Sequence, residues 1–233
     1  MKWYVQIEAE KFVLQELSKS LKSPRLSVFQ REANYYLSCD LFDSLDDPEH
    51  VFEKAKILGP VLSGATRLEL GKPLRLGNVF RENEDGSWNE FGFAEVSALI
   101  PKLFCQAAGE AVQAPSLADN VKVWLQAARR NGEVDEALSL FGSPDLSWVL
   151  LYKVFEIVEA DIKRKIYKTR WVTKTLEDRF TQTAQAHRHA KQSEKMRKYK
   201  PHCKPMLFHE GTTFIRTILD NWLRTKQEVQ EGT

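Results

Sequence analysis

Polar and apolar residues alternate at the start of the chain and then change to a helical spacing. Residues 3–7 have the period of two that is typical of a strand. Over residues 10–21 the apolar positions recur every three or four residues, which predicts a short helix. Pro24 ends that helix, because the residue before a proline avoids the helical region. Two further strands are predicted at 26–29 and 35–41.

A second helix is predicted to begin at Asp46-Asp47-Pro48, because aspartate caps helices and a proline in the first turn has no hydrogen bond to lose. Its apolar positions continue to Leu62, with Gly59-Pro60 bending or ending it. Further strands are predicted at 66–70, 74–80 and 91–96, with a hairpin turn at 84–87. The order β-α-β-β-α-β plus a hairpin matches a ferredoxin-like unit. We therefore predict an α+β fold with a ferredoxin-like domain over residues 1–108.

Strand patterns disappear after about residue 99. A short helix at 101–108 and a linker at 109–115 are predicted to lead into a helical part. Its apolar stripes predict helices at 121–128, ending at Asn131-Gly132, at 134–141, at 148–162, from Thr173 or Thr175 past Phe180, and at 210–223. Ser143-Pro144-Asp145 or Ser147 caps the helix at 148–162. The four main helices predict an all-helical bundle domain over 116–233.

Charge is distributed very unevenly along the 233 residues. The net charge is +2, yet residues 163–204 hold 14 lysines and arginines against three acids, a net charge of +11. The rest of the chain is therefore at −9. Such a split favours a polyanionic partner, either RNA or DNA or an acidic protein surface.

Composition and motifs narrow the class of protein. Cys39, Cys105 and Cys203 are few and widely spaced, which favours a reducing compartment. No apolar run reaches the roughly 18 to 20 residues that span a bilayer, and residues 1–8 lack the order of a signal peptide. We therefore expect a cytoplasmic protein without membrane association. Phosphate loops, dinucleotide-binding glycines, zinc-protease and nucleophile-elbow motifs are absent, so we expect no cofactor.

The basic segment is the first candidate site. Lysine and arginine neutralise phosphates, and the interleaved aromatic residues could stack on unpaired bases. The alternative is that the aromatic residues are core and the charges are solvated. Lys174 and Arg188 would share a face of one continuous helix, with Arg179 flanking it. The residues that we expect to bind are Lys174, Arg179, Arg188, His189, Lys195, Arg197 and Lys198.

Four of the five histidines lie near Cys203, but we expect no metal site. A zinc site needs four ligands, usually in tight pairs. His187 and His189 would point about 200° apart on a helix, so they could not bind one ion together.

An arginine–histidine pair is the third candidate. The segment from Arg197 to His202 resembles the R-x(4–6)-H motif of HEPN-type helical ribonucleases, in which the two residues are thought to act on the scissile phosphate and the ribose 2′-hydroxyl. Pro201 departs from that helical pattern. Arg188-His189 lies in a better helical context but lacks the spacing.

Seven short stretches, spread over nearly the whole chain, are similar to a set of uncharacterised bacterial proteins. They are MKWYVQIEA (1–9), GATRLELG (64–71), FGSPDLSW (141–148), LYKVFEIVEAD (151–161), FTQTA (180–184), RHA (188–190) and FIRTILDNWL (214–223). The resemblance implies no activity and no functional residues.

Three hypotheses therefore remain. The leading one is a non-enzymatic interaction protein whose basic helical half binds nucleic acid or an acidic partner. The second is a HEPN-like ribonuclease of toxin or phage-defence type, with Arg188 and His189, or Arg197 and His202, converging in a cleft across a homodimer. The third is a structural subunit that binds only protein.

Overall fold

The computed structural model describes residues 2–93, 117–189 and 204–231. The fold is α+β, with a six-stranded antiparallel sheet and seven α-helices in the described ranges. The chain forms two compact units. Unit 1 comprises Met1–Leu58 and Arg75–Asn120, and unit 2 comprises Gly59–Leu74 and Val121–Thr233. The predicted helix at 101–108 and linker at 109–115 lie outside the described residues.

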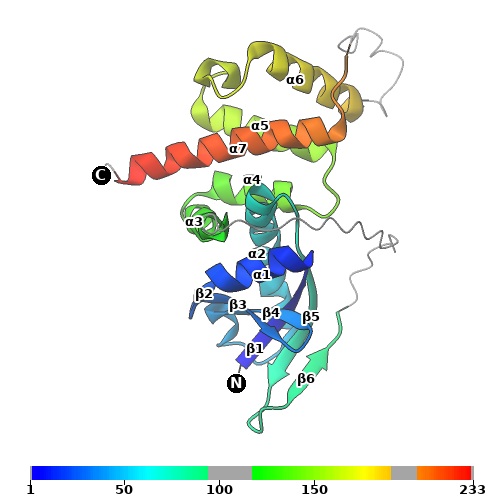
Figure 1. Cartoon of the computed structure of the whole chain (residues 1–233), viewed down its shortest axis with the longest axis vertical. Coiled ribbons are helices and arrows are strands. Elements are labelled where there is room, and N and C mark those ends of the chain that lie inside the picture. Colours follow the sequence, from blue (N-terminus) through cyan, green and yellow to red (C-terminus); the bar gives the residue numbers. More distant parts are fainter. Residues whose placement is uncertain (1, 94–116, 190–203, 232–233) are drawn as a thin grey trace. The chain divides into compact units, whose positions relative to one another are not determined.

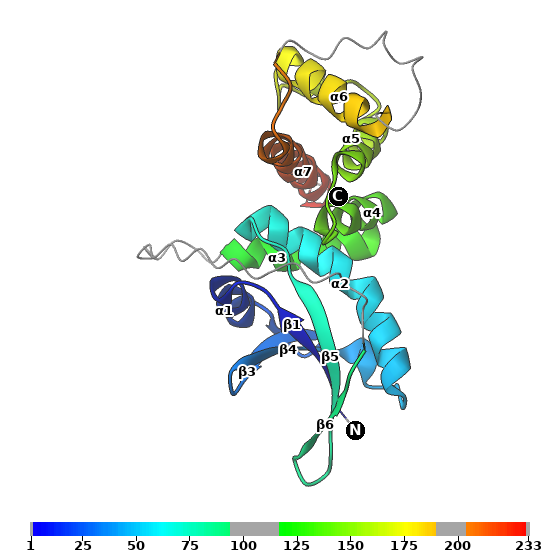
Figure 2. The same ribbon diagram turned by 90° about the vertical axis from the view of Figure 1, so that its right-hand side faces the viewer.

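Unit 1 is built on the antiparallel sheet (Figure 1). Its spatial order is β2-β3-β4-β1-β5-β6. The strands are β1 (Lys2–Glu8), β2 (Lys22–Ser23), β3 (Leu26–Arg31), β4 (Asn34–Cys39), β5 (Arg75–Glu82) and β6 (Trp88–Phe91). The turn between β5 and β6 projects beyond the other strands (Figure 2). Along the chain the strands and α-helices of this part follow the order β1-α1-β2-β3-β4-α2-β5-β6, with the two-residue strand β2 between α1 and β3.

The two faces of this sheet carry different side chains because strand residues alternate. One face buries Val5, Ile7, Val28 and Leu37 together with the apolar stripe of helix α1 (Lys11–Ser20). The other face carries a row of aromatic rings in mutual contact, in which Trp88 stacks on Tyr4 at 4.4 Å between ring centroids. The full row is Tyr4, Phe29, Tyr36, Phe80 and Trp88.

The strand predicted at 66–70 is wrong. Helix α2 runs without a break from Pro48 to Leu70, through Gly59-Pro60. All residues from 61 to 68 are buried, so this half of the helix has no polar face, and its sequence lacks the apolar stripe by which a helix is recognised. Inside unit 2, Ser63 donates to the carbonyl of Gly142 at 2.8 Å and Arg67 donates to that of Phe141 at 2.8 Å.

Backbone meets backbone where α2 crosses α4 (Gly132–Gly142) in unit 2. A Cβ atom at Gly64 would collide with the carbonyl oxygen of Leu138, and one at Gly142 would collide with that of Pro60. Neither obstacle is a flexible side chain that could turn away. Glycine at both positions is therefore required for the two helices to approach this closely.

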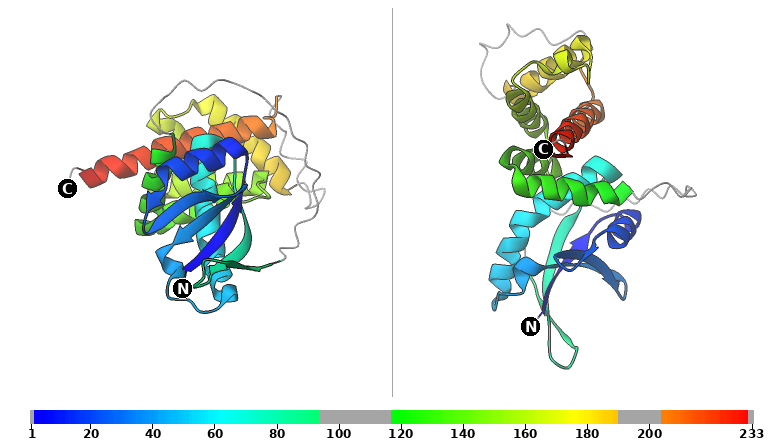
Figure 3. Two further views of the ribbon diagram at one scale, coloured as in Figure 1. Left: turned by 60° about the horizontal axis from the view of Figure 1, so that its bottom comes forward. Right: turned by 90° about the vertical axis from the view of Figure 1, so that its left-hand side faces the viewer.

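The remaining helices of unit 2 are α3 (Leu117–Arg130), α5 (Trp148–Ile162), α6 (Lys174–His189) and α7 (Phe208–Glu231). Helices α5, α6 and α7 pack as a group (Figure 2 and the right view of Figure 3). Each contributes one ring to a buried cluster of Phe155, Phe180 and Phe214, in which Phe180 and Phe214 are 4.5 Å apart between centroids.

The N-caps of α4 and α5 show which of the predicted capping residues begin helices. Ser147 is the N-cap of α5, its hydroxyl accepting from the Leu150 N–H at 3.5 Å, which confirms one of the two predicted caps. Asn131 was expected to close the preceding helix, but its side chain accepts from the Val134 N–H at 3.0 Å and begins α4. Across the described ranges, no helix combines the length and apolar character needed to cross a membrane.

We predict that Gly64→Ala lowers the free energy of unfolding by about 2–3 kcal/mol or more, because the added methyl group forces α2 away from α4. Gly132→Ala is the matched control, since nothing lies within 4 Å of a Cβ atom there. The control is expected to change stability by less than about 1 kcal/mol. Denaturant unfolding followed by circular dichroism measures both. Equal stabilities of the two variants would contradict the close packing.

Candidate functional site

Residues 163–174, which join α5 to α6, form what is here called the basic loop. They include six lysines and arginines and no acid, and they contain a short 3-10 helix, η2 (Ile166–Thr169). The six cations are Lys163, Arg164, Lys165, Lys168, Arg170 and Lys174. All six are exposed. This is the strongest concentration of one charge among the described residues.

Local hydrogen bonds and one buried side chain fix the path of the basic loop. Ile166 is fully buried and anchors the loop to unit 2. The Thr169 hydroxyl donates to the Ile166 carbonyl at 2.6 Å and accepts from the Trp171 N–H at 3.2 Å. These bonds, which involve no charged side chain, fix the backbone of the loop between Ile166 and Trp171.

A buried carboxylate ties the basic loop to α6. Glu177 is only 5% exposed, and its Oε2 accepts from the backbone N–H of Tyr167 at 2.6 Å. Burial raises the pKa of Glu177, and the nearby carboxylates of Glu159 and Asp178 raise it further, whereas the Tyr167 N–H and the charge of Lys165 lower it. Burial prevails, so the net shift favours the neutral acid.

Two of the cations have a left-handed backbone. The φ angle of Lys163 is 54° and that of Arg170 is 68°. Such a conformation costs a residue with a side chain roughly 1–2 kcal/mol, and glycine or asparagine is the usual occupant. Long cations therefore occupy two positions where stability alone favours glycine.

Few of these charges are neutralised by acids. Lys165 pairs with Glu159 at 2.9 Å, and the Lys174 ammonium lies 5.9 Å from the centre of the Tyr167 ring. Within the described parts of the chain, the other five cations of the basic loop form no ion pair. The loop therefore presents uncompensated positive charge to solvent.

A groove with a volume of about 440 Å³ adjoins the basic loop within unit 2. The end of the loop, the first turns of α6 and the start of α7 line it. The lining residues are Trp171, Val172, Thr173, Leu176, Arg179, Met206, His209, Glu210, Thr213, Phe214 and Thr217. Apolar side chains supply much of this lining, and Trp171 is partly exposed.

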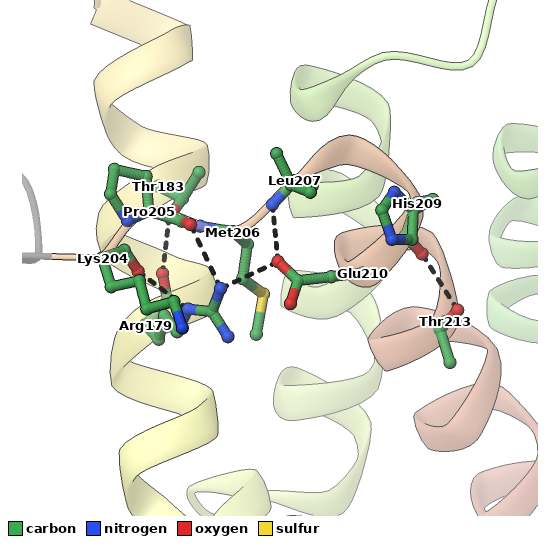
Figure 4. Close-up of polar contacts among 9 residues, drawn as sticks. All are labelled: Arg179, Thr183, Lys204, Pro205, Met206, Leu207, His209, Glu210 and Thr213. Carbon is green, nitrogen blue, oxygen red and sulfur yellow. Dashed lines mark hydrogen bonds and ion pairs between the residues drawn. The ribbon is translucent and has the colours of Figure 1, made fainter.

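Arg179, which the sequence suggested as a binding residue, holds the chain that enters α7 (Figure 4). Its guanidinium donates to the carbonyls of Lys204 at 2.8 Å and Pro205 at 3.1 Å, and it pairs with Glu210 at 2.8 Å. Glu210 also accepts from the Leu207 N–H at 2.7 Å, which lowers its pKa, and the charge of Arg179 lowers it further. Most donors of Arg179 are thus engaged within the fold.

Helix α6 is continuous from Lys174 to His189, as the sequence predicted. Lys174 and Arg188 therefore lie at opposite ends of it, about 21 Å apart along its axis. Arg188 is 3.7 Å from the Glu156 carboxylate and lies over the Tyr152 ring at 5.7 Å. His189 ends the helix. Of the predicted binding residues, Lys174 alone belongs to the basic loop.

The other expected residues lie outside the described ranges. These are Lys195, Arg197, Lys198 and His202, so the second arginine–histidine pair has no described geometry. His187 stacks on Trp148 at 5.3 Å between centroids, which gives it a packing role. Among the described side chains, no group of three or more histidines, cysteines and acids could hold a metal ion.

Sequence reasoning missed two parts of this site. The role of Glu177 was hidden because it is one of only two acids in a basic helix start, and nothing local distinguishes it from Asp178. The groove was hidden because it requires α7 to pack beside the basic loop, more than 30 residues later in the chain. An acidic residue one turn into a helix that follows a cationic loop is the signal that could have indicated the bond from Glu177 to the Tyr167 N–H.

No known protein family, curated protein or solved structure matches this chain.

The hydrogen bond between the Tyr167 N–H and Glu177 predicts that two substitutions of Glu177 differ in stability. Glu177→Ala leaves the Tyr167 N–H buried without an acceptor, so we expect a loss of about 1–3 kcal/mol in the free energy of unfolding. Glu177→Gln keeps an oxygen acceptor without the charge, so at pH 7 it should be at least as stable as the wild type. Denaturant unfolding at several pH values measures both effects.

The contribution of Glu177 to the free energy of unfolding changes with pH in a defined direction. A raised pKa means that the stabilising contribution of Glu177 is fully present below its unfolded pKa of about 4.5 and is lost as the pH rises through the folded value. The advantage of Glu177→Gln should therefore grow from about pH 4.5 upward and vanish below it. A Gln variant that is less stable than the wild type at pH 7 would show that the carboxylate charge stabilises the loop.

Proposed function

We propose that this protein binds nucleic acid through the basic loop of unit 2, and that the loop contacts the phosphate backbone. The observation that carries the proposal is the exposure of six cations without an acid, five of them outside any ion pair in the described structure. Cations that bind phosphates release condensed counterions, which supplies most of the affinity of non-specific binding.

Two further features of the basic loop support its role as a ligand-binding surface. Lys163 and Arg170 occupy left-handed positions where glycine would be less strained. Partly exposed Tyr167 and Trp171 lie between the cations, and aromatic rings next to cations suit bases and phosphates together. An acidic protein surface would use the charges but would have less use for the rings, so we favour nucleic acid.

We extend the proposal to the sheet of unit 1, which we interpret as a ferredoxin-like unit. The order β3-β4-β1-β5 supports it, because β1 and β3 then lie on either side of the inserted antiparallel strand β4. The three widely spaced cysteines support a reducing, cytoplasmic setting.

The test replaces charged side chains with neutral polar ones. We expect the triple variant Arg164→Gln, Lys168→Gln, Arg170→Gln to bind a fluorescent single-stranded oligonucleotide about tenfold or more weakly at low salt. The slope of log affinity against log salt should become shallower by about 2, since each phosphate contact contributes roughly 0.7. Fluorescence anisotropy over a salt series measures both quantities.

The matched control is Lys122→Gln, Arg129→Gln, Lys153→Gln, which removes the same charge from exposed positions on α3 and α5. It should bind like the wild type, apart from a small long-range effect. Equal losses in both triple variants would mean that net charge alone is responsible and would overturn the proposal.

A denaturing gel of the same mixtures made with RNA tests the ribonuclease hypothesis, and we expect the RNA to remain intact. Absence of binding by the wild type, together with salt-sensitive binding to an acidic polypeptide such as polyglutamate, would replace nucleic acid by an acidic protein as the partner.

A further inference from the structure

We infer that the groove beside the basic loop takes an unpaired nucleobase, and that the protein therefore selects single-stranded over duplex nucleic acid. This inference rests on the proposed function and specifies its substrate. A volume of about 440 Å³ leaves room for a base and part of its sugar. Trp171 supplies a partly exposed aromatic ring on which a base can stack, and Leu176, Met206 and Phe214 make the neighbouring lining apolar.

Thr213 and Thr217 line the groove from α7, and their hydroxyl groups can accept hydrogen bonds from a ligand. The Thr213 hydroxyl donates its hydrogen to the His209 carbonyl at 2.9 Å, and the Thr217 hydroxyl donates to the Thr213 carbonyl at 3.1 Å. Each oxygen keeps lone pairs and has no second hydrogen to donate. A ligand at this wall must therefore bring its own donors, as the N–H groups of a base do.

Glu210 adds a negative charge to the same lining. Its Oε2 accepts from Leu207 and Arg179, whereas its second oxygen has no dashed contact in Figure 4 and no hydrogen-bond partner among the described residues. The lowered pKa of Glu210 keeps the carboxylate ionised near neutral pH. The guanidinium of Arg179 also lines the groove, but Glu210 compensates its charge.

This division of charge sets the orientation of the ligand. A carboxylate and a row of acceptors repel phosphate from the groove, while Arg170 and Lys174 flank Trp171-Val172-Thr173 in the chain and can hold phosphates at its edge. The base then enters the groove and the backbone stays outside. In a duplex the bases are stacked and paired, so they could not enter without being flipped out.

The experiment uses the full-length chain and three 12-nucleotide probes: a mixed-sequence single-stranded DNA, the same backbone with abasic sites throughout, and the duplex. We expect the wild type to bind the single strand about tenfold more tightly than the abasic strand, since stacking of one base is worth about that factor. Trp171→Leu should remove this preference and leave abasic and duplex binding within about twofold. Trp171→Phe, which keeps a ring, should retain most of it.

A second variant guards against a folding defect in Trp171→Leu. Thr217→Trp fills the groove from α7, and the Thr217 hydroxyl donates only to its own helix, so no tertiary hydrogen bond is lost. It should also abolish the preference for the single strand. Salt-dependent binding in which neither variant alters that preference would overturn the groove as a base site while leaving the proposed function intact. No binding of any probe at low salt would overturn both.

Discussion

The structure of unit 2 depends on the absence of two side chains. At Gly64 and Gly142 the backbones of α2 and α4 touch, and a methyl group at either position would meet a carbonyl oxygen. This contact lets the second half of α2 become an internal helix, buried from residue 61 to 68. Its end is in turn held by Arg216 of α7, which donates to the carbonyls of Leu68 at 2.6 Å and Glu69 at 2.8 Å. The Arg216 side chain thus supplies hydrogen-bond donors to carbonyls that have no partner within the last turn of the helix.

The basic loop depends on this helical frame in the same way. Ile166 and the Glu177 carboxylate fix the loop, while five of its six cations form no ion pair in the described structure and remain in solvent. Arg179 shows the opposite use of a cation, because two carbonyls and Glu210 bind its guanidinium. Whether a cation is available to a ligand therefore depends on its contacts within the fold. The number of cations in the sequence does not decide this.

The sequence predicted most of the elements whose burial is one-sided. The strand at 3–7, the helix at 148–162 with its Ser147 cap, and the long helix after Thr173 all follow from periodicity and capping residues. It failed at 66–70, where Thr66-Arg67-Leu68 is buried on every side and tertiary contacts override the local pattern. Pro60 within α2 added to the error, because a proline inside a helix removes a hydrogen bond and usually marks an end.

The candidate site was predictable only in part, for a comparable reason. Charge composition located the basic segment, and Lys174 lies in the basic loop. The pairing of Arg179 with Glu210 and of Arg188 with Glu156 is set by helix packing that no local pattern encodes. The groove likewise joins residues 171–179 with residues from 206 onward.

Photo-cross-linking of a single-stranded RNA containing 4-thiouridine, followed by mass spectrometry of the peptides, tests the proposed interface directly. We expect cross-links on the peptides that contain Tyr167 and Trp171, and their loss at high salt. Efficient, salt-sensitive cross-links confined to other parts of the chain would contradict the proposed binding through the basic loop.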